Sequence, residues 1–456
     1  MAEMNKYPDA HPTSRKLFER AQKVMPGGNT RTTVSVKPFP VYLVRGEGCK
    51  VWDVDGNSYY DCINNFTSMI HGYGNGGVIA AAEKQLHLGT AFGAPTPSEI
   101  ELAELLVDRI PSVEQVRFTN SGTEAVMMAI KAARAFTGRS KIVKIEGAYH
   151  GSYDFAEVSL DSTPANWGDS PASTPFAKGT PQGVLDDVLV VPFNDVELLE
   201  AVLREHGETI AAVLIDPVPN RAGLIAARKD YIEALFRSCR RVGSLVIFDE
   251  VISFRLGYAG AQGLLGVEPD LTTLGKVIGG GFPVGAVGGR ADVMQMFDGT
   301  AGKPFLPHGG TFTANPITMV AGFAAMRELT PAGYAHLDRI GDALRQKINS
   351  SFRKQKLAGQ CVGLGSLLRL HFTNREITDY RSAYLGAAER EKFEQFYKGL
   401  ISRGVLIAPY GLIALSTPVT MEDVDVIATA VDVALSELTS SDRERSPQHT
   451  PASMAS

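Results

Sequence analysis

The chain has 456 residues, of which 44% are hydrophobic and 21% are charged, enough for a large buried core in two or more domains. Its formal net charge of -5 gives no general attraction to phosphate backbones or anionic lipids, so we expect neither nucleic acid nor a membrane as a partner. The four cysteines are irregularly spaced, which excludes a zinc site and a disulfide framework. No apolar run is long enough to span a membrane, and we expect a cytoplasmic protein without a metal site.

Residues 1–70 form an N-terminal segment that we assign to a smaller domain. Within 41–61, alternating apolar residues flank a D-G pair, which predicts a β-hairpin. The following glycines, Gly72 to Gly77, match G-x-G-x-x-G, and Glu99 lies at roughly the spacing of a nicotinamide-binding site. The segment before them is a poor strand and Glu99 opens an apparent helix, so we interpret these glycines as a turn.

Residues 71–330 predict a large α/β domain. Short apolar strands alternate with helical patterns from about Val116 onward, as in a mainly parallel sheet covered by helices. The clearest strand candidates are VRFTN, KIVKIEG, DDVLVVP, AAVLID and GSLVIFDE. Residues 161–183 are rich in proline, serine and glycine and predict a long surface loop, a candidate lid or subunit contact.

Residues 331–440 predict a smaller α+β domain. Two helical stretches flank the strand candidate GSLLRLHF, and ISRGVLIAPYGLIALSTP suggests a further pair of strands before a last helix from Glu422. Residues 441–456 are polar and have too little apolar surface to offset their ordering entropy, so we expect a disordered tail.

Polar residues follow several of the predicted parallel strands, where ligands bind in sheets of this kind. Ser121, Gly122 and Thr123 open a helix, whose free amides and dipole attract phosphate. Tyr149 and His150 follow the next strand and bring a ring and an imidazole to the same edge. Taken singly, these residues are equally typical of a helix cap, a packed tyrosine and a core histidine.

Carboxylates and one lysine complete the set. Asp249 and Glu250 end the apolar strand GSLVIFDE, and Asp216 ends AAVLI, where buried acids require partners. Lys276 follows LTTLG, where desolvation would lower its pKa and make it a candidate Schiff-base nucleophile. A lone lysine in a loop would be unremarkable. Together with a phosphate cradle, an aromatic ring and an aspartate for a pyridinium nitrogen, however, it forms the set that pyridoxal phosphate requires.

These motifs resemble the class III aminotransferases of the fold-type I pyridoxal phosphate superfamily. NSGTEAVMMAIKAAR, YHGSYD, VIFDEVISFR, DLTTLGKVIGGGFPVGAVGGR and HGGTFTANP carry the resemblance, which extends from about Pro26 to Leu435. The chain most resembles the branch of glutamate-1-semialdehyde aminomutases and β-phenylalanine-type aminotransferases. The resemblance implies a fold-type I structure, pyridoxal 5'-phosphate as cofactor and a homodimer with shared active sites.

The resemblance also assigns residue roles. Lys276 and Asp249 match the family's catalytic Schiff-base lysine and pyridinium aspartate, and Arg31 matches an arginine that holds a substrate carboxylate. The matching cofactor-binding positions are Ser121, Gly122, Thr123, Tyr149, His150, Asp216, Val251 and Thr311, the last reaching the phosphate from a neighbouring subunit.

Two departures from the family pattern bear on the substrate. Asp216 is one methylene shorter than the glutamate found in much of the class. Residues 408–418 offer Tyr410 where related enzymes tend to carry a mobile arginine for the acceptor's carboxylate. We therefore expect transfer from amines or aromatic β-amino acids to a small keto acid such as pyruvate, by a ping-pong mechanism through Lys276.

The sequence also bears on three alternative functions. An aminomutase of the glutamate-1-semialdehyde type shares every cofactor residue, so it remains the main alternative. A catalytically inactive binding protein would have little reason to keep the complete set of Lys276, Asp249 and the phosphate loop. A P-loop nucleoside triphosphatase is disfavoured because no G-x-x-x-x-G-K-[ST] occurs.

Overall fold

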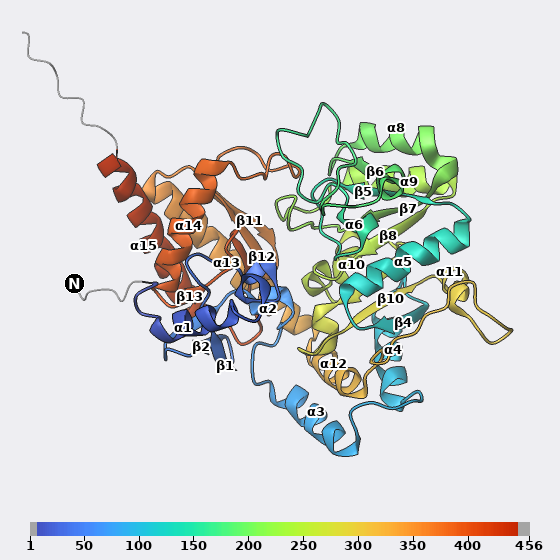
Figure 1. The fold of residues 1–456 in the computed structure, drawn as a ribbon, viewed down its shortest axis with the longest axis horizontal. Coiled ribbons are helices and arrows are strands. Elements are labelled where there is room, and N and C mark those ends of the chain that lie inside the picture. Colours follow the sequence, from blue (N-terminus) through green and yellow to red (C-terminus); the bar gives the residue numbers. More distant parts are fainter. Residues whose placement is uncertain (1–6, 446–456) are drawn as a thin grey trace, which may run out of the picture.

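The computed structural model describes residues 7–445 and shows two lobes. The N-terminal and C-terminal segments lie together in one lobe, whereas the middle of the chain forms the other (Figure 1). No helix among the described residues is long and apolar enough to cross a membrane.

The middle lobe is built on a seven-stranded sheet with the order β4-β10-β9-β8-β7-β5-β6. Its strands are β4 (Gln115–Thr119), β5 (Lys141–Ile145), β6 (Val188–Val191), β7 (Ile210–Ile215), β8 (Leu245–Asp249), β9 (Leu271–Gly275) and β10 (Gly285–Gly289). Only β10 runs antiparallel to its neighbours, so the expectation of a mainly parallel mixed sheet is confirmed. All five strand candidates quoted from this region are present.

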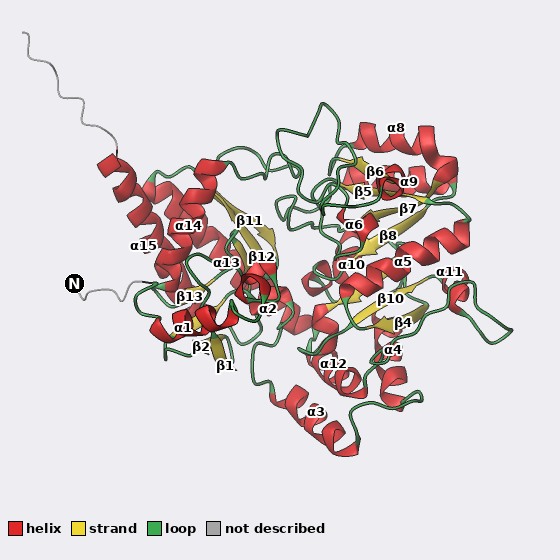
Figure 2. Ribbon diagram, in the orientation of Figure 1, coloured by secondary structure: helices red, strands yellow, loops and turns green. Residues whose placement is uncertain are grey.

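Helices cover both faces of this sheet (Figure 2), and alternate residues of each strand face opposite sides. Ile142, Leu214 and Ile247 pack with α5 (Gly122–Thr137), while Val143, Val213 and Val246 pack with α8 (Val196–His206) and α9 (Lys229–Val242). The remaining helices here are α3 (Gly76–Leu88), α4 (Pro97–Arg109), α6 (Asp154–Glu157), α7 (Gln182–Asp186), α10 (Gly260–Leu265), α11 (Ala291–Met294) and α12 (Pro316–Glu328). Burial on both faces explains the continuous apolar runs of the strands.

The other lobe combines two small sheets, ordered β1-β2-β3-β13 and β11-β12-β14. Their strands are β1 (Leu43–Glu47), β2 (Lys50–Asp53), β3 (Ser58–Asp61), β11 (Gln360–Leu364), β12 (Leu367–His371), β13 (Val405–Leu406) and β14 (Leu412–Ala414). Its helices are α1 (Pro12–Ala21), α2 (Asn64–Thr67), α13 (Pro331–Gln355), α14 (Ala387–Ile401) and α15 (Met421–Arg445), with 3-10 turns at 26–28 and 32–34. The middle lobe has further 3-10 turns at 207–209, 253–256, 276–279 and 295–297.

Three details of this lobe differ from the sequence-based expectation. The hairpin predicted within 41–61 is present as β2 and β3, and β1 extends it to three strands. The strands predicted within ISRGVLIAPYGLIALSTP do not pair with each other, because β13 joins β3 and β14 joins β12. Helix α15 continues to Arg445, into the range predicted as a disordered tail, and residues 446–456 lie outside the described residues.

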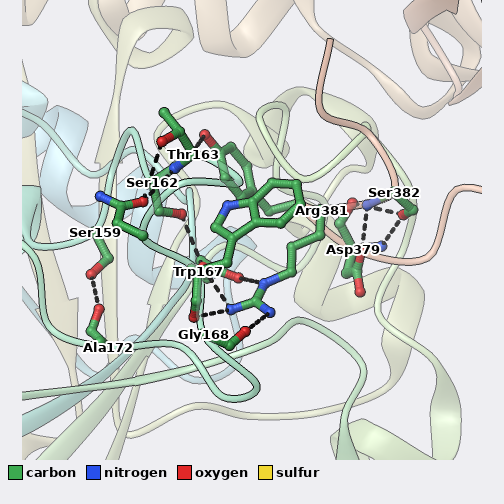
Figure 3. A network of polar contacts seen from close by, with 12 residues as sticks. Ser159, Ser162, Thr163, Trp167, Gly168, Ala172, Asp379, Arg381 and Ser382 are labelled. Carbon is green, nitrogen blue, oxygen red and sulfur yellow. Dashed lines mark hydrogen bonds and ion pairs between the residues drawn. The ribbon is translucent and has the colours of Figure 1, made fainter. Parts of the chain in front are cut away.

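The proline-rich segment contains no helix or strand from 161 to 181 and is fastened to the other lobe (Figure 3). The Arg381 guanidinium donates to both carboxylate oxygens of Glu146 and to the backbone oxygens of Trp167 and Gly168. Ser162 Oγ donates to the same Glu146 carboxylate over 2.9 Å. Arg381 therefore links the end of β5, the long loop and the segment before α14.

We expect Arg381→Met to destabilise this link, because it leaves the almost fully buried Glu146 carboxylate without its cation. The expected loss in the free energy of unfolding is about 1–3 kcal/mol, with faster proteolytic cleavage within 161–181. Urea unfolding and limited proteolysis measure both effects. Arg390→Met is the control, since Arg390 bonds only the Tyr384 hydroxyl in an exposed position. Equal behaviour of the two variants would show that the link does not hold the loop.

Candidate active site

The candidate site lies at the carboxyl edge of the large sheet. Strands β4, β5, β7, β8 and β9 end at this edge, and the chain continues there into the helix or loop that follows each strand. Asp249 is the last residue of β8. The segments after β4, β5, β7 and β9 carry Ser121, Tyr149, Asp216 and Lys276 respectively. Parallel topology therefore brings together side chains that are far apart in the sequence.

Asp249 is the best-held side chain of the site. It is buried, and its Oδ2 accepts from His150 Nδ1 over 2.7 Å, while its Oδ1 accepts from Thr273 Oγ1 at 2.9 Å and from the Val251 amide at 3.1 Å. Burial opposes its charged form, but the hydrogen bonds, first that of His150, hold its pKa below the usual value. The carboxylate is thus kept ionised in a site from which most water is excluded.

His150 and Glu250 lie next to Asp249 but make different contacts. His150 orients Asp249, and its Nε2 is buried without a hydrogen-bond partner among residues 7–445. Glu250, the neighbour of Asp249, faces away and accepts from the amides of Ala261 and Gln262, at the start of α10. Glu250 therefore caps a helix, and only Asp249 of the pair faces this site.

Lys276 begins a 3-10 turn directly after β9, with φ +49°. A left-handed conformation costs a non-glycine residue roughly 1–2 kcal/mol, and such strain is concentrated at functional sites. Its Nζ has no hydrogen bond or salt bridge among the described residues. Burial lowers the pKa of Lys276, and the negative charges of Asp249 and Asp216 oppose that shift. The site therefore holds a desolvated amine that no protein group neutralises by contact.

The glycines after Lys276 serve packing as well as the turn. A Cβ on Gly280, which has φ +59°, would lie 2.4 Å from the backbone oxygen of Ala321 in α12. Glycine at this position therefore lets the turn after Lys276 pack closely against α12.

The N-terminus of α5 forms the second part of the site. Ser121 Oγ accepts from the Glu124 amide at 3.2 Å, and the Glu124 carboxylate accepts from the Asn120 amide at 2.7 Å. The first amides of a helix lack intrahelical acceptors and point outward, where they can bind an anion. A Cβ on Gly122 would lie 2.9 Å from Val251, so glycine allows the helix to approach the segment after β8. Thr123 Oγ1 accepts from the Ser152 amide at 3.2 Å.

Tyr149 and Thr311 are exposed in this chain. Tyr149 is 48% accessible, which leaves its ring free to contact a ligand. Thr311 precedes α12 and makes no hydrogen bond within residues 7–445, whereas Thr313, two residues later, accepts from Asn120 Nδ2 at 3.4 Å. Within its own chain, therefore, Thr313 and not Thr311 is hydrogen-bonded to Asn120, the residue before Ser121.

Arg31 lies beside a strained turn. Residues 64–67 all have positive φ, and the turn is held by Asn64 Nδ2, which donates to the Ala414 backbone oxygen over 2.6 Å. Asn65 Oδ1 accepts from Arg31 Nη1 at 2.9 Å, and the Arg31 guanidinium lies 5.7 Å from the centre of the Phe66 ring. Phe66, Ile252 and Tyr410 pack against the same apolar cluster. Arg31 thus borders an apolar surface to which Tyr410 also contributes.

Arg369, an arginine that the sequence did not single out, lies close to the Tyr410 ring. The Tyr410 hydroxyl lies 3.5 Å from Asn220 Nδ2, and the guanidinium of buried Arg369 lies 5.7 Å from the centre of its ring. Arg369 belongs to β12, about 40 positions earlier in the chain. No local signal marked it, because its position in a buried strand resembles that of an ordinary core residue.

This arrangement fits pyridoxal 5'-phosphate. The unpaired amine of Lys276 suits an aldehyde, the ionised Asp249 carboxylate suits a protonated ring nitrogen, and the start of α5 suits a phosphate. Val251 and Tyr149 offer an apolar and an aromatic surface for the two faces of a ring. In the described part of the chain no cluster of three or more metal-ligating side chains competes with this interpretation.

Asp216 provides a pH-dependent test of the site's electrostatics. Burial, and next the charge of Asp249, raise its pKa from 3.8 to about 8. The folded apoprotein therefore keeps a proton that the unfolded chain releases, and its stability falls as the pH rises through this window, by up to about 1.4 kcal/mol per unit. Asp216→Asn should lack this fall. Urea unfolding from pH 5 to 8 should show the variant gaining on the wild type, and a constant difference would contradict the assignment.

Comparison with known proteins supports the same chemistry. The family model of the class III aminotransferases matches residues 32–434. A curated glutamate-1-semialdehyde 2,1-aminomutase of Bacillus subtilis is 38% identical over 431 residues, covering 93% of this chain and 98% of the relative.

Two solved structures are also similar. An omega-transaminase from Sphaerobacter thermophilus is 51% identical with a TM-score of 0.91, covering 92% of this chain and 97% of the other. A β-phenylalanine aminotransferase from Variovorax paradoxus is 36% identical with a TM-score of 0.85 and covers 96% of each chain. The cofactor is pyridoxal 5'-phosphate. With a family match over most of its length, this chain belongs to the class III aminotransferases.

Proposed function

We propose that this enzyme transfers an amino group from an amine or an aromatic β-amino acid to a small keto acid such as pyruvate, in two half-reactions. The observation that carries the proposal is the partly buried, unpaired amine of Lys276, placed at one sheet edge with the ionised Asp249 carboxylate and the start of α5. Pyridoxal phosphate supplies an aldehyde and an electron-withdrawing ring for this chemistry.

Each residue of the site has a separate task in this proposal. Asp249, oriented by His150, keeps a proton on the ring nitrogen. Ser121, Gly122 and Thr123 hold the phosphate with their amides and hydroxyls. Lys276 would bind the cofactor and, once displaced by substrate, would take the proton from the substrate carbon and deliver it to the carbon of the cofactor's former aldehyde, a task suited to an amine of lowered pKa.

The surroundings of Arg31 support an aromatic, carboxylate-bearing substrate. Phe66, Ile252 and Tyr410 offer apolar surface, and Arg31 offers a cation at its border. The names of the two similar solved structures, an omega-transaminase and a β-phenylalanine aminotransferase, agree with donors of this kind.

An aminomutase is the second candidate, because the curated relative at 38% identity is a glutamate-1-semialdehyde 2,1-aminomutase. The two functions differ in their need for a second substrate. A transaminase turns over an amine only when a keto acid is supplied, whereas an aminomutase isomerises glutamate 1-semialdehyde alone. Incubating the purified enzyme with each substrate, with and without pyruvate, separates them.

We also propose a homodimer with shared active sites. Large apolar side chains are exposed on and near α3 and α12, including Leu88 at 65%, Phe92 at 51% and Phe312 at 62%. Leu88 and Phe92 line a groove with Phe323 of α12. A second copy would cover this surface and bring its Thr311 to the phosphate.

We expect Lys276→Ala to keep the cofactor but lose the first half-reaction by at least about 100-fold, because no other group moves the proton. The measurement is the absorbance change on mixing the loaded enzyme with 1-phenylethylamine, together with borohydride trapping of the modified peptide. Lys229→Ala, with a lysine side chain that is 91% exposed, is the control and should behave as wild type. Undiminished amine conversion by the Lys276 variant would overturn the proposal.

Shared sites predict complementation between two variants. Thr311→Ala should weaken cofactor affinity about 10-fold, because a hydrogen bond to a charged phosphate is lost. In a mixed dimer of Thr311→Ala with Lys276→Ala subunits, one site keeps both the lysine and the partner's threonine. Cofactor titration of co-expressed, doubly tagged dimers should therefore recover one tight, active site per dimer. If Thr311 acts within its own subunit, the tight site will belong to the Lys276→Ala subunit and will be inactive, so no site will be both tight and active.

A further inference from the structure

Arg369 presents an unused hydrogen-bonding edge in the interior of the protein. Its side chain is 6% exposed, and its Nη1 donates to the backbone oxygen of Asn220. Neither Nε nor Nη2 has an acceptor among residues 7–445. These two nitrogens form the side of the guanidinium that matches both oxygens of a carboxylate.

Other arginines of this chain show what that edge binds. Arg228 holds both oxygens of Asp230 through Nε and Nη2, at 3.0 and 3.1 Å. Arg381 holds those of Glu146 with the same two nitrogens, at 2.8 and 3.3 Å. Arg369 has no salt bridge, and no carboxylate of the described residues lies close enough to affect its charge. The buried Arg255 also lacks a carboxylate partner in this part of the chain, but its Nε, Nη1 and Nη2 all donate to protein oxygens, so the free edge of Arg369 points to a ligand.

The position of Arg369 connects it with the candidate active site. Its guanidinium lies behind the ring of Tyr410, whose hydroxyl lies 3.5 Å from Asn220 Nδ2. Burial raises the pKa of Tyr410, and the nearby Tyr149 adds to that shift. Asn220 follows Asp216 in the loop after β7, and its Oδ1 is also buried without a partner.

We propose that the Nε and Nη2 edge of Arg369 binds a carboxylate group of the substrate, and that the Tyr410 ring covers this edge when no such substrate is present. This inference rests on the proposed function and names a residue that selects substrates within it. It also changes the expectation from residues 408–418, because the arginine missing there is supplied by β12. The carboxylate belongs to the amino-acid donor or to the keto-acid acceptor, and the experiment distinguishes the two.

The test compares substrate pairs that differ only by a carboxylate, with wild type, Arg369→Met and the control Arg228→Met. The donor pair is β-phenylalanine and 1-phenylethylamine, and the acceptor pair is pyruvate and acetaldehyde. Each half-reaction is followed separately by cofactor absorbance over a range of substrate concentrations. Arg369→Met should weaken apparent binding of one carboxylate substrate by about 10- to 100-fold and leave its carboxylate-free partner within about twofold. Arg228→Met should change neither.

Stability separates binding from a structural role. Replacing an unpaired buried cation by an apolar side chain of similar length should leave Tm unchanged or raise it. Arg369→Lys keeps the charge but not the fork, so its binding loss should be intermediate. Loss confined to β-phenylalanine identifies the donor's carboxylate, and loss confined to pyruvate that of the acceptor. Equal losses for charged and uncharged substrates, or no loss at all, would overturn the inference. If wild type converts none of the four substrates, the proposed function itself fails.

Discussion

The active site depends on keeping one carboxylate ionised inside the protein. Asp249 sits at the end of a strand buried on both faces, where an isolated charge would take up a proton. Three donors prevent this, and each comes from a different part of the sheet edge: His150 after β5, Thr273 within β9 and the Val251 amide after β8. The nearby Asp216 accepts from the Val218 amide, but burial and the charge of Asp249 raise its pKa to about 8. Hydrogen bonding thus separates two buried aspartates into a charged and a neutral form.

Lys276 complements this arrangement. Its backbone is strained at φ +49°. Its amine is desolvated and lies close enough to Asp249 and Asp216 for their charges to raise its pKa, although it bonds to neither of them. A direct salt bridge would fix the amine and keep it protonated. The absence of that contact, within the described residues, suits the roles we propose, in which Lys276 reacts and Asp249 keeps its charge for the ring nitrogen of the cofactor.

In the proposed function, the second lobe selects the substrate. Arg31 and Arg369 both come from it, and both border the apolar surface formed with Phe66 and Tyr410. Arg31 is exposed and already bonded to Asn65, whereas Arg369 is buried with a free edge. The link from Arg381 to Glu146 and the long loop ties the same lobe to the large sheet, so the position of the substrate surface relative to Lys276 is set by contacts between lobes.

The sequence by itself determined the large sheet and the cofactor set, because strand periodicity is local and parallel strands must present their carboxyl ends on one edge. Ser121, Asp249 and Lys276 could therefore be grouped without coordinates. Only the tertiary structure decided the direction of each side chain and the long-range partners. It turned Glu250 toward a helix and away from Asp249, sent β13 and β14 to different sheets, and placed Arg369 behind Tyr410. These outcomes depend on packing between segments far apart in the chain, which no local pattern encodes.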